Sequence, residues 1–62
     1  MSQQSYERAV ADFTRATELM PAFAVALYNR SLVYTLLGMR DLSAQDRARA
    51  VRLDPTVAKS TR

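Results

Sequence analysis

The feature that most constrains this 62-residue chain is a self-similarity at an offset of 34 positions. Pro21 and Pro55 are separated by this offset, and a leucine stands two positions before each of them. Self-similarity at a fixed period of this size is typical of stacked repeat architectures. The other matched pairs are Asp12/Asp46, Arg15/Arg49, Ala16/Ala50, Leu19/Leu53 and Ala24/Ala58, with Glu7/Asp41 and Ala9/Ser43 as approximate matches.

The first half of the chain predicts one amphipathic helix. Apolar side chains recur at helical spacing between Tyr6 and Met20, which places them on one side. Ser5 is the expected N-cap, because a hydroxyl can accept a hydrogen bond from a backbone amide of the first turn. Pro21 ends the helix, since the residue before a proline avoids helical backbone angles.

The second half predicts two further helices joined by a tight turn. The first runs over 22–37 and is closed by Gly38, which can adopt the left-handed conformation of a helix C-terminus. Asp41 is the expected N-cap of the last helix, which ends near Leu53. Residues 57–62 are expected to form a short, frayed tail. The short connections predict an all-α chain whose neighbouring helices pack antiparallel.

The composition limits how so small a domain can be stabilised. A chain of this size buries only about 60% of the surface that its unfolded form exposes. The sequence has no cysteine and no histidine, so we expect neither a disulfide nor a metal site. Association with another chain is therefore the expected source of additional burial.

Catalytic chemistry is not expected either. Histidine is the most frequent general base near neutral pH, and a cysteine nucleophile is also missing. Gly38 is the only glycine, so a glycine-rich phosphate loop is excluded. We interpret the pairs Asp12/Arg15 and Asp46/Arg49 as repeat-related surface ion pairs. The sequence thus predicts neither an enzyme nor a cofactor site.

The formal net charge is +3, and the positive charge is concentrated in the C-terminal half. Such a half could attract nucleic acid, which is the alternative function. However, aspartates interrupt the arginines, and no aromatic residue lies among those of the last helix to stack on a base. A solvated polar face is therefore favoured over nucleic-acid binding. The basic residues of this half are Arg30, Arg40, Arg47, Arg49, Arg52, Lys59 and Arg62.

The sequence predicts neither a secretory signal nor a membrane segment. Residues 1–5 contain no basic stretch and no apolar run. The apolar region 22–37 is too short and too polar at its centre to span a bilayer. We therefore expect a cytoplasmic protein without a membrane partner.

The 34-residue pattern resembles that of the tetratricopeptide repeat family. The resemblance covers a half repeat over 5–21 and a full repeat over 22–55, followed by a tail over 56–62. It implies one domain spanning 1–62, an antiparallel three-helix unit that is a fragment of an α-solenoid. A generic three-helix bundle is the alternative. The residues that carry the resemblance are Ala9, Phe13, Ala16 and Pro21 in the half repeat, and Leu27, Arg30-Ser31, Tyr34, Ser43, Arg47, Ala50 and Pro55 in the full repeat.

The packing expected from this resemblance alternates small and large residues. Phe13 is expected to be buried against Leu27 and Tyr34. Arg30 stands where the family often has leucine, and we expect its aliphatic stem to lie along this contact. The small residues at the closest approach of the last two helices are Ser31, Ser43 and Ala50.

Two departures from the family pattern concern the last helix. Arg40 and Arg47 occupy the positions equivalent to Tyr6 and Phe13. Because a terminal repeat requires a polar outer face, we interpret the last helix as a C-terminal cap.

The resemblance implies that the inner face of the second helix holds a peptide or a helix of a partner protein. The side chains of Tyr28 and Asn29 could form hydrogen bonds with the partner's main chain. A second copy of the chain, or simple packing on its own third helix, could cover the same face. The candidate contact residues are Val25, Tyr28, Asn29, Leu32, Thr35 and Leu36.

Self-association is expected for a second reason. In the family, Ala9 and Ala16 would be covered by the first helix of a complete repeat. Burying apolar surface contributes about 25 cal/mol per Å², so a second copy that covered both open faces would stabilise the chain. We therefore expect a homodimer or another closed homo-oligomer, with the second helix or the open side of the first helix at the interface.

Overall fold

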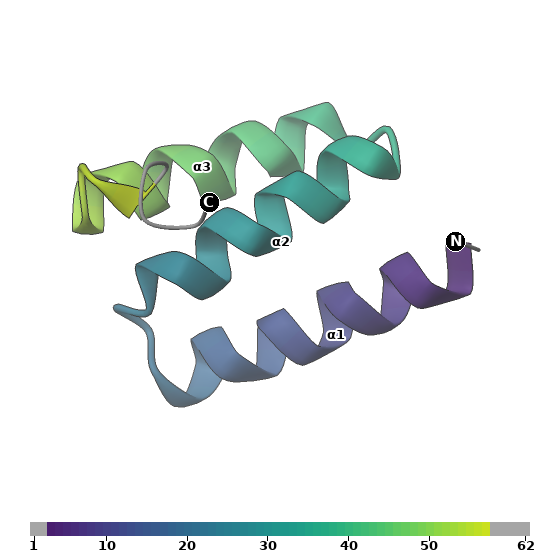
Figure 1. Ribbon diagram of the computed structural model, residues 1–62, viewed down its shortest axis with the longest axis horizontal. Coiled ribbons are helices and arrows are strands. Elements are labelled where there is room, and N and C mark those ends of the chain that lie inside the picture. The colour runs from purple at the N-terminus through teal and green to yellow at the C-terminus, as the bar shows by residue number, and fades with distance from the viewer. Residues whose placement is uncertain (1–2, 58–62) are drawn as a thin grey trace.

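The computed structural model describes residues 3–57 as three helices, and this part of the chain contains no strand. The helices are α1 (Gln3–Leu19), α2 (Ala24–Leu36) and α3 (Arg40–Leu53). Consecutive helices run antiparallel, and α2 lies between the other two (Figure 1). Helix α2 packs against both neighbours, whereas α1 and α3 do not pack against each other. The predicted all-α, three-helix fold is confirmed.

The predicted helix N-caps are wrong. Helix α1 begins at Gln3, which places Ser5 inside the helix, since glutamine extends a helix well. Helix α3 begins at Arg40 behind Met39, whose carbonyl accepts the Ser43 N–H at 3.0 Å without any side-chain cap. The carboxylate of Asp41 lies in the first turn instead, where it interacts favourably with the helix dipole.

The turn between α2 and α3 is centred on Gly38, whose φ is +80°. The Gly38 N–H donates to the Thr35 carbonyl at 3.1 Å, and the Met39 N–H donates to the Tyr34 carbonyl at 2.8 Å. This pair of hydrogen bonds is a Schellman motif, which satisfies carbonyls that the last helical turn leaves open. The left-handed conformation predicted for Gly38 is confirmed.

Small side chains bring α2 and α3 together. Ser31, Ser43 and Ala50 are all buried, as predicted. The Ser43 hydroxyl donates to the Ser31 carbonyl at 2.8 Å, so the two helices are joined by a direct hydrogen bond. A second hydrogen bond, 2.6 Å long, links the hydroxyls of Thr35 and Ser43.

The apolar core lies between α2 and the C-terminal side of α3. Ala24, Leu27, Ala50 and Val57 form one buried cluster. Leu27 belongs to this cluster and is fully buried, whereas Phe13 of α1 is only half-buried. The predicted full burial of Phe13 is therefore wrong, because the tightest packing is on the α3 side of α2.

The predicted frayed tail over 57–62 is wrong at its first residue, Val57, which is part of the core. Its side chain is 0% exposed, because the chain turns back after α3 and the Val57 N–H donates to the Asp54 carbonyl at 3.0 Å. The Asp54 carboxylate supports this turn by accepting the Thr56 hydroxyl at 2.7 Å and the Thr56 N–H at 3.0 Å. Both hydrogen bonds lower the pKa of Asp54, and the bond from the Thr56 hydroxyl has the larger effect. The rest of the predicted tail, 58–62, lies outside the described residues.

The outer surface of α3 is mixed, because Leu42, Val51 and Leu53 are exposed, and its interpretation as a C-terminal cap stays a prediction. Arg40 and Arg47 are exposed, as expected for arginines that replace packing aromatics.

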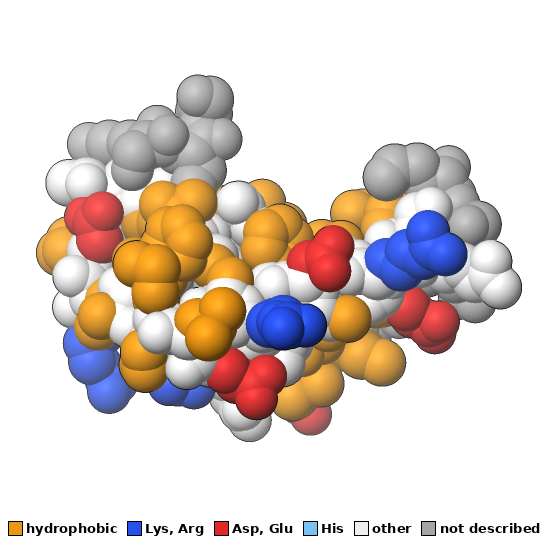
Figure 2. Space-filling model, turned by 90° about the horizontal axis from the view of Figure 1, so that it is seen from below, with side chains coloured by type: hydrophobic (Ala, Val, Ile, Leu, Met, Phe, Trp, Pro, Cys, Tyr) orange, Lys and Arg blue, Asp and Glu red, His pale blue; other side chains and the backbone are white. Residues whose placement is uncertain are grey.

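Seen from the side of α1, hydrophobic side chains gather towards the end of the molecule that holds the α1–α2 turn (Figure 2). The described helices include none that is long and apolar enough to cross a membrane. Large apolar side chains exposed around this turn are Leu19, Met20 and Phe23.

Candidate functional site

One stripe of α2 lies opposite the fully buried Leu27, and only its N-terminal end touches the core. A helix advances about 100° per residue, so residues four, seven and eleven positions apart return to one face. We call this face the α2 stripe, formed by Val25, Asn29, Leu32 and Leu36. The fully buried Leu27 lies on the other side of the helix.

The exposure of the α2 stripe increases towards its C-terminal end. Val25 packs on the buried cluster, as does Tyr28 beside the stripe. Leu32 is 48% exposed and Leu36 is 62% exposed. Packing on the chain's own core therefore accounts for Val25 and Tyr28 and leaves the two leucines without a cover.

The two polar candidates, Thr35 and Asn29, also differ in whether their polar groups are used inside the chain. The Thr35 hydroxyl donates to the Ser31 carbonyl at 3.1 Å and is also hydrogen-bonded to Ser43, so its polar group is already used inside the chain. Asn29 is half-buried, and its side-chain amide forms no hydrogen bond with the described residues. Asn29 thus offers both a donor and an acceptor next to the exposed leucines.

The most highly connected side chain of α2 is Arg30, whose role differs from the prediction. Its Nε and Nη2 donate to the two carboxylate oxygens of Asp46 at 2.5 and 2.8 Å. Its Nη1 donates to the Thr14 hydroxyl at 3.0 Å, and its guanidinium carbon lies 5.6 Å from the centre of the Tyr34 ring. Arg30 therefore binds α1 and α3 at once, where only contact through its aliphatic stem was expected.

The Arg30–Asp46 pair is shielded from water. The side chains are 13% and 6% exposed. The hydrogen bonds with Asp46 raise the pKa of Arg30, and burial opposes this only in part. The predicted surface pair of Asp46 with Arg49 is wrong, because Asp46 faces α2 while Arg49 is exposed.

Sequence reasoning missed this pair although the chain contains a signal for it. Asp46 lies between Ser43 and Ala50 at helical spacing, in the middle of the small residues that were expected to touch α2. A carboxylate on such a face requires a buried cationic partner. Arg30, already recognised as an arginine at an apolar position, was the available partner.

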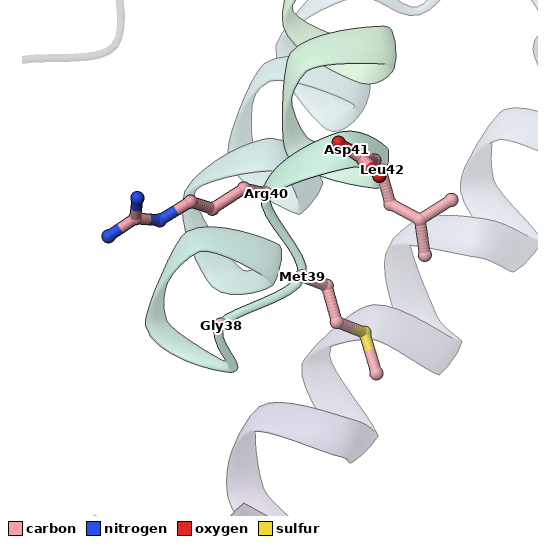
Figure 3. Close-up of a pocket in the computed structure, with 5 residues that line it drawn as sticks. All are labelled: Gly38, Met39, Arg40, Asp41 and Leu42. Carbon is pink, nitrogen blue, oxygen red and sulfur yellow. The ribbon is translucent and has the colours of Figure 1, made fainter.

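The side chains that line a shallow hollow at the α2–α3 turn do not converge on a common point. Met39 and Leu42 point to one side of it, and the Arg40 side chain points to the other (Figure 3). Within residues 3–57, no group of three or more acidic, histidine or cysteine side chains could hold a metal ion. The α2 stripe is therefore the better candidate for a functional surface.

Comparison of the chain with protein-family models, with curated proteins and with solved structures gives no significant match.

Proposed function

We propose that this chain is a tetratricopeptide-like protein-interaction module that binds another protein through the α2 stripe. The observation that carries the proposal is the exposure of Leu32 and Leu36 beside the amide of Asn29. Two leucines in line on one helix suit the apolar face of a partner helix or peptide. The free amide can fix the partner's register by hydrogen bonding to its main chain.

The antiparallel order of the three helices supports the repeat interpretation. The small residues Ser31, Ser43 and Ala50 are buried where a tetratricopeptide hairpin would bring its helices together. The exposed Arg40 and Arg47 suit the outer face of a terminal repeat. A partner protein that covered the α2 stripe would supply the apolar burial that a chain of this size lacks.

A second copy of the chain is the partner that can be tested first. We expect the sedimentation coefficient to rise with concentration, and Leu32→Glu to suppress this rise by placing a charge in the contact. Leu53→Glu is a matched control, because Leu53 is 47% exposed but lies at the end of α3. Equal effects of both substitutions would argue against the α2 stripe.

A chain that stays monomeric requires a test for a different protein partner. A photo-reactive amino acid at Leu36 should then crosslink one discrete protein in the cells that produce the chain. The same amino acid at Leu53 should not crosslink that protein, and Leu32→Glu should abolish the crosslink at Leu36. A folded monomer that yields no Leu36-specific crosslink would overturn the proposed function.

Nucleic-acid binding is less well supported. Arg40, Arg47, Arg49 and Arg52 are all exposed on α3, but they do not share one face. Asp41 lies among them, and α3 contains no aromatic side chain on which a base could stack.

A further inference from the structure

Helices α1 and α3 are related by the 34-residue offset, but they present different faces to α2. Helix α3 uses its small-residue face, with Ser43, Asp46 and Ala50 buried. Helix α1 meets Arg30 through Thr14. The positions of α1 that correspond to the buried face of α3 are Ala9, Asp12 and Ala16.

We call this corresponding face of α1 the Asp12 face, and its central residue, Asp12, is turned away from α2. At about 100° per residue, Asp12 lies roughly 160° around the helix from Thr14. Its carboxylate is exposed and forms neither a hydrogen bond nor an ion pair with the described residues, whereas Asp46 is 4% exposed and holds Arg30. Among the described helices, α1 packs against α2 alone. The same residue pattern is therefore buried on α3, whereas on α1 Asp12 is exposed and Ala9 and Ala16 are only half-buried.

We propose that the Asp12 face binds an amphipathic helix of a partner protein that carries an arginine followed by a small residue. The contact between α2 and α3 shows which chemistry such a face accepts, because Arg30 binds Asp46 while the next residue, Ser31, permits close approach. On α1, Asp12 supplies the carboxylate, and Ala9 and Ala16 leave room for the approaching backbone. A bidentate guanidinium–carboxylate contact selects arginine over lysine.

The Asp12 face differs from its counterpart on α3 in one respect. Ala9 replaces Ser43, whose hydroxyl donates to the Ser31 carbonyl. The Asp12 face therefore cannot reproduce that hydrogen bond, and the specificity that we propose for it depends on the Asp12 carboxylate. An intact second copy does not supply the required helix through α2, because its Arg30 is already held by Asp46.

The test measures binding of a helix with the required chemistry to the full chain. The probe is residues 22–37 of this chain, attached to an unrelated soluble carrier protein, and the carrier alone serves as the blank. We expect saturable binding that Asp12→Asn in the full chain weakens about tenfold, since a hydrogen-bonded charge is lost. Glu18→Gln is the matched control: Glu18 is an exposed carboxylate on α1 but lies outside the Asp12 face. It should leave the affinity unchanged.

A charge exchange identifies the contact. The probe with Arg30→Glu should bind the unmodified chain poorly, and binding should return when the chain carries Asp12→Arg. Circular dichroism of both chain variants should match that of the unmodified chain, because Asp12 is exposed.

Three results would overturn the proposal. Absence of binding at millimolar probe is the first. Equal weakening by Asp12→Asn and Glu18→Gln is the second, because it would indicate general charge attraction. Binding that is insensitive to Asp12→Asn but responds to Asp46→Asn is the third, because the probe would then replace α2 on α3. Because the probe itself carries the α2 stripe, Leu32→Glu in the full chain is a further control, and it should leave the affinity for the probe unchanged.

Discussion

Thr14 and Asp46 bind the same guanidinium group from two helices that do not pack against each other. Thr14 lies on α1 and Asp46 on α3, and Arg30 reaches both from α2. The planar guanidinium can bind both because its donors point in fixed, diverging directions. One side chain thereby links all three helices through hydrogen bonds.

Replacing Arg30 alone should destabilise the fold strongly. Arg30→Met leaves the buried Asp46 carboxylate without a partner, which costs about 3–5 kcal/mol of unfolding free energy. For so small a chain this is enough to populate the unfolded state. Thermal unfolding followed by circular dichroism measures the loss, and Arg49→Met is the control because Arg49 is exposed.

The double variant Arg30→Met/Asp46→Leu separates charge burial from packing. Replacing both members of a buried ion pair by apolar residues is often neutral, so most of the lost stability should return. If Arg30→Met unfolded at the same temperature as Arg49→Met, Arg30 would not be a structural link.

Features that depend on neighbouring residues could be predicted from the sequence. Gly38 closes α2 because one local backbone conformation requires glycine, and the order of the helices follows from apolar spacing and two prolines. Ser31, Ser43 and Ala50 were expected as contact residues because the resemblance to the tetratricopeptide repeat pattern implies small residues where two neighbouring helices come closest.

Features that depend on contacts distant in the sequence were missed. Val57 lies two positions after Pro55 and precedes a mostly polar tail, so nothing local indicates that it fills the core. Asp46 lies three residues before Arg49, a spacing that favours a surface pair, whereas its real partner is sixteen positions away. Among the candidate contact residues, the sequence could not separate Thr35, whose hydroxyl bonds Ser43, from Asn29, whose amide is free within the described part of the chain.

Val57 should contribute to stability although it lies beyond α3. Val57→Ala removes two buried methyl groups, and we expect it to lower the unfolding free energy by about 2 kcal/mol. Val51→Ala makes the same chemical change at a side chain that is 39% exposed, so its effect should be much smaller. Denaturant unfolding of both variants provides the comparison, and equal midpoints would show that Val57 is not part of the core.

Gly38 should be sensitive to any side chain for conformational reasons alone. A β-carbon at this position would meet nothing within 4 Å, so no clash is expected. The left-handed φ of +80° still makes Gly38→Ala less stable by about 1 kcal/mol. Gly38→Asn should lose less, because asparagine tolerates this conformation better than alanine. Melting temperatures ranked glycine, asparagine, alanine would agree with this explanation, and the reverse order would contradict it.

Asp54 should titrate at a lower pH than an ordinary aspartate. The Thr56 hydroxyl and N–H both donate to its ionised form and lower its pKa from the usual 3.8. Because the folded-state pKa is lowered, this contribution to stability is complete above pH 3.8 and is lost as the pH falls through the folded-state value. Carbon NMR of the Asp54 carboxyl group measures the midpoint. Thr56→Val should raise the midpoint, and an unchanged midpoint would show that the hydroxyl does not act on Asp54.

Phe13 and Arg47 occupy equivalent positions in the 34-residue pattern but should respond differently to truncation. Phe13 is half-buried on α1, so Phe13→Ala should cost about 1–2 kcal/mol, roughly half the value of a fully buried aromatic side chain. Arg47 is exposed on α3, and Arg47→Ala should leave the melting temperature nearly unchanged. The difference tests whether α1 and α3 turn different faces towards α2. Equal losses in both variants would mean that the outer face of α3 is packed in solution, against a second copy or another chain.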